Sequence, residues 1–235
     1  MSRIGEATAL LRRAAEASGG KLLVFFSGGK DSLTVLDLAV RAEIPVECVY
    51  MYFIDGLQCV EDGLTRALAR FPGVKLHKVP DPSLSHCLSE GILCVGRPVR
   101  KVQLADIERY MRKVTGIEWV VSGARSKDSF TRSMYVGKCS GYNEQGRRVY
   151  PIWNWNTSDV VAYLRGRRIH LPKRFQKMTE HGVSGVSLMP DFLAWVETAY
   201  PDDYARIADL FPFVGVWKAR EKFYGAQVVA GQRTP

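Results

Sequence analysis

Cysteine is scarce in this chain, with five residues among 235 and no C-x-x-C pair. The first residues carry no basic, apolar leader of the kind that directs secretion, and no small-residue cleavage site follows them. Secreted domains of modest size commonly depend on a framework of disulfides, which this pattern does not support. We therefore expect the chain to work in a reducing cytoplasm.

Long apolar runs and metal motifs are also missing. Apolar runs such as Leu22–Phe26 are far shorter than the roughly 20 residues that a membrane-spanning helix needs. The four histidines show no metal-ligand spacing, and neither H-E-x-x-H nor a paired Cys/His knuckle occurs. We expect no membrane span and no metal site built by protein ligands alone.

Positive charge is plentiful. Thirty-three Lys and Arg against 24 Asp and Glu give a net charge of +9 and a pI of about 9.4, which favours polyanionic partners such as nucleotides or nucleic acid. Between Arg165 and Lys177 there are six basic residues and no acid. This run fits a phosphate-facing strip, and it fits equally well a solvated helix end whose cations suit the negative pole of the helix dipole.

The hydrophobic pattern alternates between strands and helices. Short apolar runs predict strands at 21–26, 45–53, 74–79 and 117–121, and helical spacing predicts helices at 6–17, 31–41, 60–70 and 102–114. Such alternation predicts a Rossmann-like α/β fold, with a parallel sheet and helices on both faces.

The rest of the chain has a different texture. A stretch rich in Gly, Ser and Arg at 123–148 is long for a connecting loop, and we interpret it as a functional basic arm. Asn156–Asp159 is typical of a helix start. Helical spacing continues over 190–223 with breaks at Pro201 and Pro212. We therefore expect a nucleotide-binding domain at 1–165 and a mainly helical C-terminal extension, packed on it, at 166–235.

The sequence S-G-G-K-D-S, residues 27–32, stands between the first predicted strand and its helix. In an open α/β sheet, ligands bind beyond the carboxyl ends of the strands, where a helix start presents unpaired N–H groups. Gly28 and Gly29 permit unusual backbone angles and close approach, Ser27 and Ser32 offer hydroxyls, and Lys30 offers a cation. These features favour a phosphate site over a turn that merely connects. The spacing matches neither a Walker loop nor G-x-G-x-x-G.

The motif resembles the PP-loop of the ATP pyrophosphatase superfamily, and further landmarks resemble its phosphoadenosine phosphosulfate (PAPS) reductase-like branch. They are Asp55 and Glu61 in YFIDGLQCVE, the run Arg100–Leu104, Gly123-Ala124-Arg125 with Asp128 and Arg132, and Pro151–Val160. The chain departs from the branch by lacking the proline of R-K-V-x-P-L and by having Asp128 in place of a glutamate. The likeness spans about residues 21–165.

The resemblance implies a domain that either splits ATP between its α and β phosphates or binds an adenylyl sulfonucleotide. Charge neutralisation dominates such chemistry, so Lys30, Asp31, Arg125 and Arg132 are the candidate catalytic residues, with Mg²⁺ as the ATP counterion. Both arginines would clamp phosphate or sulfate as the arm closes. The candidate nucleotide-binding residues are Ser27, Gly28, Gly29, Lys30, Asp31, Ser32, Asp55 and Gly123. Asp55 fits a solvated strand-end carboxylate equally well.

Sulfur chemistry separates the possible functions. Reductases of this branch use a cysteine in a C-terminal E-C-G-L-H segment, whereas this chain has no cysteine after Cys139. Iron–sulfur relatives carry a Cys-Cys pair and a C-x-x-C, and here a single Cys94 stands in the first of these regions, which argues against a cluster. If a thiol is reactive, Cys94 or Cys139 is favoured by the nearby cations Arg97 and Lys138.

The sequence therefore favours a PP-loop ATP pyrophosphatase that activates an acceptor for sulfur transfer, with nucleic acid as the acceptor, as in DNA phosphorothioation or tRNA thiolation, and with a cysteine desulfurase as sulfur donor. The alternatives are a PAPS or adenylyl-sulfate reductase and a non-catalytic subunit that binds adenine nucleotides. Aromatic residues interleaved with the basic arm offer stacking faces for bases, although core packing is the commoner use of tryptophan. They are Phe130, Tyr135, Tyr142, Trp153 and Trp155.

Overall fold

The computed structural model describes residues 2–169 and 186–216, which pack as two compact units. Within these ranges the first unit contains 2–52, 62–80 and 103–169, and the second contains 53–61, 81–102 and 186–216. Each unit gathers segments that are distant in sequence.

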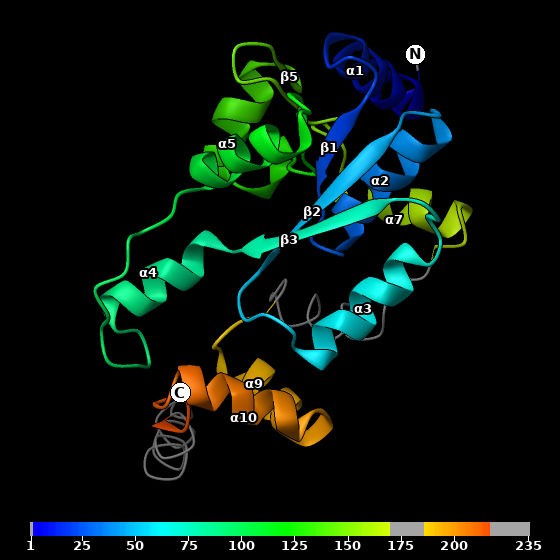
Figure 1. The fold of residues 1–235 in the computed structure, drawn as a ribbon. Helices are drawn as coiled ribbons and strands as arrows, with labels where there is room; N and C mark the ends of the chain where they lie inside the picture. Colours follow the sequence, from blue (N-terminus) through cyan, green and yellow to red (C-terminus); the bar gives the residue numbers. More distant parts are fainter. Residues whose placement is uncertain (1, 170–185, 217–235) are drawn as a thin grey trace, which may run out of the picture. The chain divides into compact units, whose positions relative to one another are not determined.

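A sheet of six strands organises the first unit (Figure 1). The strands are β1 (Leu22–Phe25), β2 (Val46–Tyr52), β3 (Lys75–Pro80), β4 (Val120–Val121), β5 (Tyr142–Asn143) and β6 (Arg148–Val149). Their order is β3-β2-β1-β4-β6-β5, and all neighbours are parallel except β5, which joins β6 antiparallel. The parallel, Rossmann-like sheet predicted from the alternating pattern is confirmed.

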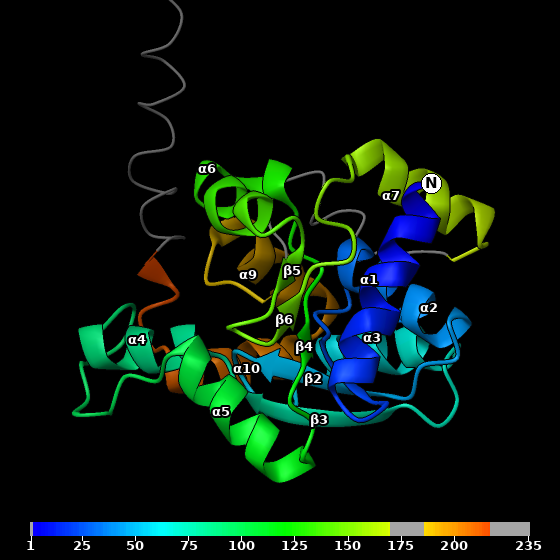
Figure 2. The same cartoon turned by 90° about the horizontal axis from the view of Figure 1, so that it is seen from above.

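Helices cover both faces of this sheet (Figure 2). On one face lie α1 (Arg3–Ala17), α2 (Lys30–Arg41) and α7 (Thr157–Gly166), and α5 (Leu104–Thr115) lies on the other. Helix α3 (Gln58–Leu68) connects β2 to β3. Strand β1 lies in the hydrophobic core. The side chains of its first three residues are fully buried, and the burial of each stabilises the fold by about 1.5–3 kcal/mol.

Local signals explain where these helices begin and end. The Ser2 hydroxyl accepts a hydrogen bond from the Gly5 N–H and caps α1, and α5 ends at Gly116 in the left-handed conformation. The backbone N–H of Asn156 donates to Asp159 at the start of α7, as expected from the sequence.

The predicted loop at 123–148 contains regular structure. It forms the 3₁₀ turn η1 (Ser126–Asp128), the short helix α6 (Phe130–Arg132), the π-helical turn η2 (Ser133–Gly137) and the hairpin of β5 and β6. The composition did not indicate a hairpin, because its strands are only two residues long. The β4 strand is likewise shorter than the 117–121 predicted.

The second unit is mainly helical. It contains α4 (Pro82–Glu90), α9 (Pro190–Ala199) and α10 (Pro201–Leu210), each with proline in its first turn. Helix α4 was missed, although Asp81 followed by proline is a start signal, and the break at Pro201 is confirmed. The rings of Phe53 and Phe211 stack 5.5 Å apart.

A buried carboxylate begins α3 in this unit. Asp203 accepts hydrogen bonds from the backbone N–H groups of Gln58 and Cys59, both at 2.8 Å. Among the described residues, no helix combines the length and apolar character that crossing a bilayer requires.

Candidate functional site

The S-G-G-K-D-S motif forms the turn between β1 and α2, as predicted. Gly28 has a φ of 72°, in the left-handed region that glycine adopts without strain. Gly29 precedes the helix, and no side chain of the described residues caps α2 through a hydrogen bond. The hydroxyl of Ser32 donates instead to the Gly29 carbonyl at 3.0 Å and lies 3.2 Å from the Ser27 hydroxyl. The first N–H groups of α2 thus form an uncapped helix start, suited to an anion.

Two charged side chains of this turn pair with each other. The Lys30 ammonium donates to the Asp31 carboxylate over 2.5 Å, and both side chains are mostly buried. Lys30 therefore brings its cation to the start of α2, while Asp31 occupies one of its donor positions. An anionic ligand at this place would compete with Asp31 for the ammonium group.

Gly123 brings the segment after β4 against the start of α2. A Cβ atom at this position would lie 2.9 Å from the carbonyl carbon of Asp31 and 3.1 Å from the backbone nitrogen of Ser32. Contacts this short do not occur between real Cβ atoms and backbone, so the approach requires glycine. Gly123 therefore has a packing reason, whether or not it contacts a nucleotide.

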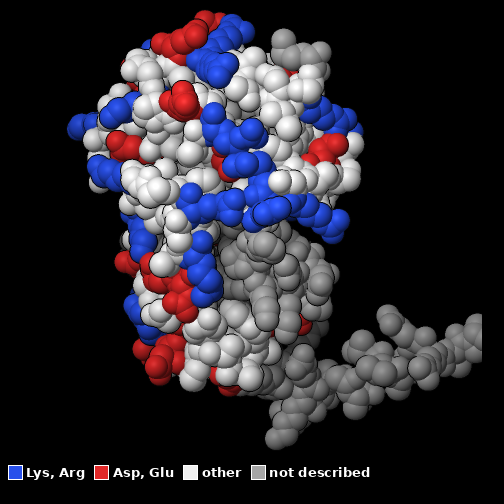
Figure 3. Space-filling model, turned by 90° about the vertical axis from the view of Figure 1, so that its right-hand side faces the viewer, with Lys and Arg blue, Asp and Glu red and all other residues white. Residues whose placement is uncertain are grey.

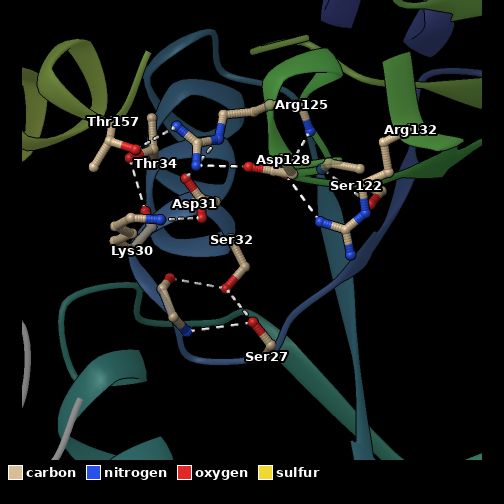
Figure 4. A network of polar contacts seen from close by, with 12 residues as sticks. Ser27, Lys30, Asp31, Ser32, Thr34, Ser122, Arg125, Asp128, Arg132 and Thr157 are labelled. Atoms are coloured by element: carbon tan, nitrogen blue, oxygen red, sulfur yellow. Dashed lines mark hydrogen bonds and ion pairs between the residues drawn. The ribbon is translucent and has the colours of Figure 1, made fainter. Parts of the chain in front are cut away.

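Arg125 is the centre of the polar network shown in Figure 4. Its guanidinium is buried, with 6% of the residue exposed, and Nη2 lies 2.7 Å from Asp128 Oδ1. Nη1 donates to the Thr157 hydroxyl at 3.2 Å, and Nε lies 3.3 Å from Asp31 Oδ1. One arginine thus links the phosphate loop, the arm and the start of α7.

Asp128 holds the arm in place from three directions. Besides the guanidinium of Arg125, it accepts the backbone N–H of Arg125 at 3.0 Å and pairs with Arg132 Nη1 at 2.9 Å. Arg132 is half exposed, and among the described residues it forms its ion pair with Asp128, which therefore holds it in position. The two predicted arginines are therefore brought together by a residue that the sequence analysis treated only as a departure from the family pattern.

The network leaves two buried atoms without hydrogen bonds. Asp31 Oδ1 and Arg125 Nε face each other as an ion pair, but neither makes a hydrogen bond with any described residue. Buried polar atoms are nearly always paired, so unmet capacity at this position fits a site that is completed by a ligand or by water. The acceptor, Asp31 Oδ1, and the donor, Arg125 Nε, lie beside the uncapped start of α2.

The residues present fit magnesium as a counterion of a bound nucleotide. Among the described residues, no group of three or more His, Cys, Asp or Glu could hold a metal ion. Magnesium is commonly held by one or two carboxylates together with phosphate oxygens. Asp31, with one oxygen free of hydrogen bonds, is the carboxylate of this site that could contribute.

Asp55 belongs to the second unit. Its side chain is exposed, and its backbone carbonyl accepts from Arg206 Nη2 at 3.1 Å, with Arg206 Nη1 donating to the Gly56 carbonyl at 2.5 Å. A nucleotide contact of Asp55 therefore remains a prediction. Neither Arg206 nor Asp203 was singled out from the sequence, because each acts across some 150 positions of the chain.

The cysteines fall into both units. Cys48 and Cys139 belong to the first, and Cys59, Cys87 and Cys94 belong to the second. Burial raises the pKa of Cys87, which favours its thiol form, and the buried Cys94 thiol lies 3.9 Å from the Cys87 carbonyl. The reactivity of Cys94 or Cys139, and the expected absence of a cluster, remain predictions.

The basic strip begins at the end of α7. Arg165 and Arg168 are exposed there, whereas Arg167 pairs with the buried Asp37 of α2 at 2.8 Å. Arg70 donates to the backbone carbonyls of 167 and 168, which is a structural cap of the helix. Lys173, Arg174 and Lys177 lie outside the described residues. Figure 3 shows Lys and Arg gathered in a band on the face of the molecule where α7 lies.

The S-G-G-K-D-S motif stands at the end of β1 in a Rossmann-like, mainly parallel sheet, with the side chains of Lys30 and Arg125 beside it. The family model described as "Phosphoadenosine phosphosulfate reductase domain" matches residues 21–210. The chain belongs to this family, as its motifs predicted. No curated protein matches the chain.

Three solved structures are similar to this chain. One is U34-tRNA thiolase NcsA from Methanococcus maripaludis with its 4Fe-4S cluster, at 13% identity and TM-score 0.48, covering 89% of this chain and 78% of that one. Another is the phosphoadenylyl-sulfate (PAPS) reductase from Candida auris in a phosphate complex, at 18% identity and TM-score 0.49, covering 73% of this chain and 84% of that one. The third is the NH3-dependent NAD synthetase from Campylobacter jejuni subsp. jejuni NCTC 11168 in complex with the nitrate ion. Its identity is 15% and its TM-score 0.45, and the match covers 100% of this chain and 98% of that one. At these identities and scores, no activity is transferred from them.

Proposed function

We propose that this protein is an ATP pyrophosphatase that cleaves ATP between the α and β phosphates and so activates an acceptor for sulfur transfer. The observation that carries the proposal is the uncapped start of α2 with Lys30 beside it and with buried Asp31 and Arg125 atoms that lack hydrogen bonds. Backbone N–H groups, a cation and a positive helix end are the features that hold a polyphosphate.

In this mechanism the chain's residues act by positioning and by neutralising charge. The N–H groups at the start of α2 bind phosphate oxygens. The Lys30 ammonium group gives up its hydrogen bond to Asp31 and donates to a phosphate oxygen instead. Arg125, already oriented by Asp128 and Thr157, directs its Nε toward the same space. Asp31, together with the phosphate oxygens, would hold magnesium, which would supply positive charge to neutralise the phosphates.

The bond changes follow from this arrangement. An oxygen of the acceptor attacks the α phosphorus, the α–β phosphoanhydride bond breaks, and pyrophosphate leaves with the electron pair. The terminal sulfur of a persulfide donor, such as a cysteine desulfurase, then attacks the adenylated acceptor, and AMP leaves with the electron pair of the bond that breaks. A second thiol of the donor, or an external dithiol, attacks the resulting disulfide, so that the sulfur stays on the acceptor and the thiols are oxidised to a disulfide. Preorganised donors stabilise the charge that develops in such a step.

The charge of the chain supports nucleic acid as the acceptor. The net charge is +9, Arg165 and Arg168 are exposed at the end of α7, and Figure 3 shows a band of Lys and Arg on one face of the molecule. Polyanions bind such surfaces through their phosphates and release counterions on binding. DNA and tRNA are both included in this proposal, as is a location in the cytoplasm.

Labelled ATP with magnesium, incubated with and without DNA or tRNA, provides the test. We expect AMP and pyrophosphate, and ADP instead would contradict the assignment. Lys30→Ala should abolish cleavage, because it removes the cation beside the helix start. Lys113→Ala is the matched control, because Lys113 is an exposed lysine on α5. This variant should cleave ATP like the unmodified protein.

The family description supports a second candidate, reduction of PAPS or adenylyl sulfate. The same loop would bind the nucleotide phosphates, but the sequence holds no cysteine after Cys139 to form the thiosulfonate link. Sulfite release from PAPS in the presence of thioredoxin would favour this function. Tight retention of ATP without turnover would favour the third alternative, a regulatory nucleotide-binding subunit.

A further inference from the structure

The structure sorts the five aromatic residues of the arm region into buried and exposed. Trp155 is buried, with 2% exposed, and packs edge-on to Tyr163. The ring of Tyr142 packs against Trp119 and lies under Arg13, with the Arg13 guanidinium 3.8 Å from the ring centre. These aromatic rings serve packing rather than recognition.

Of the remaining three, Phe130 presents a free ring face. Trp153 is half-buried, and its ring lies against Gly141. Tyr135 packs edge-on to Tyr150 with centroids 6.1 Å apart. Phe130, by contrast, is 82% exposed. Phe130 is therefore the most exposed of the five, ahead of Tyr135, which is 47% exposed and has Tyr150 against its ring.

Firm contacts hold the segment that carries Phe130, so its exposure does not come from a frayed end. The backbone N–H and the hydroxyl of Ser126 both donate to the Trp153 carbonyl, at 2.8 and 2.9 Å. Val136 is fully buried, and Lys127 donates to the Asn156 side chain at 2.6 Å. A ring held on such a segment binds with little further loss of conformational freedom.

The surroundings of the ring are apolar and positively charged. Met134, about one turn along, is 61% exposed, and the π-helical turn η2 that contains it is of a kind common at functional sites. Residues 123–138 contain four cations and a single acid, Asp128, which is already paired with both arginines. Arg132 and Lys138 are exposed on this segment.

We propose that Phe130 is a stacking platform for an unpaired base of a single-stranded nucleic acid, whose phosphates contact Arg132 and Lys138. This inference rests on the proposed function for its class of acceptor. A flat ring face and neighbouring cations match the alternating bases and phosphates of a single strand, whereas a duplex hides its base faces. The same segment carries Arg125, which contacts Asp31, so a nucleotide on Phe130 is presented on the arm that reaches the phosphate loop.

Binding of a short fluorescein-labelled oligothymidylate or oligouridylate, measured by anisotropy, tests the platform. Loss of one stacked base weakens binding by about fivefold to a hundredfold. We expect Phe130→Ala to show a loss in this range, Phe130→Trp to bind like the unmodified protein, and Phe130→Leu to bind like Phe130→Ala. Tyr110→Ala is the matched control, because Tyr110 is a 58% exposed aromatic residue on α5 and its removal should leave binding unchanged.

An oligonucleotide backbone without bases isolates the stacking contact. Abasic sites should weaken binding to the unmodified protein but not further weaken binding to Phe130→Ala. Equal binding by Phe130→Ala and the unmodified protein would overturn the proposal, as would Phe130→Leu binding as well as Phe130→Trp, or duplex binding with the same dependence on Phe130.

The pyrophosphatase proposal is read out separately. Binding of ATP, measured without nucleic acid, should be the same in Phe130→Ala as in the unmodified protein. Failure to cleave ATP with normal, Phe130-dependent binding of single strands would refute the activity and leave the platform standing.

Discussion

The pairing of Asp128 with the buried Arg125 makes Asp128→Ala the most informative substitution in the arm. It removes a charge-assisted hydrogen bond to a guanidinium that is 6% exposed, which is worth about 1.5–3 kcal/mol. It also removes the acceptor of the Arg125 N–H, worth about 1 kcal/mol, and a half-exposed pair with Arg132 worth at most about 1 kcal/mol. We therefore expect unfolding free energy to fall by about 3–5 kcal/mol.

Asp106 provides a control because, like Asp128, it accepts the backbone N–H of the residue three positions earlier and pairs with an arginine, here an exposed one. It accepts the Gln103 N–H at 3.0 Å and pairs with the exposed Arg109 at 3.1 Å. Asp106→Ala should therefore cost only about 1–2 kcal/mol. Urea unfolding of both variants, followed by circular dichroism and extrapolated linearly, gives the comparison.

The difference between the two variants measures the buried contact. If Asp128→Ala costs no more than Asp106→Ala, the guanidinium of Arg125 is not held by Asp128 and the described network is wrong. Asp128→Glu restores the residue of the family pattern and should recover most of the loss. Because Arg125 is a proposed phosphate ligand, Asp128→Ala should also raise the KM for ATP, whereas Asp106→Ala should not.

Two further predictions concern packing and pH. Gly123→Ala should lower the unfolding free energy in urea by about 1–3 kcal/mol, because its Cβ would overlap the Asp31 backbone. Gly166→Ala is the control, since nothing lies within 4 Å of its Cβ, and it should be neutral or slightly stabilising. Equal effects of the two substitutions would refute the close approach at Gly123. The hydrogen bond from His77 lowers the pKa of Glu47, so this pair stabilises the protein above the unfolded carboxyl pKa of about 4.3 and loses that contribution as pH falls through the lower folded value. Glu47→Gln should therefore make stability fall less steeply as the pH is lowered below the unfolded carboxyl pKa, and an unchanged slope would assign the acid sensitivity to other groups.

Local patterns were enough to predict most of the sheet and its first helices. Strands β1 to β3 and helices α1 and α2 appear within a few residues of the ranges expected from apolar spacing, because each buries a regular face. The domain boundary at residue 165 stays a prediction. The described residues form two units, and each unit combines segments from several parts of the sequence.

The candidate site was predictable where it is local and hidden where it depends on distant contacts. The sequence alone determined the phosphate-loop turn, since glycine conformation, hydroxyls and a helix start act within six residues. Only the tertiary structure decided that Arg125 meets Thr157, that Asp203 begins α3, and that Phe130 is the most exposed of the five aromatic residues. These contacts join positions 32 to 145 residues apart or depend on which faces are covered, and neither periodicity nor local propensity contains that information.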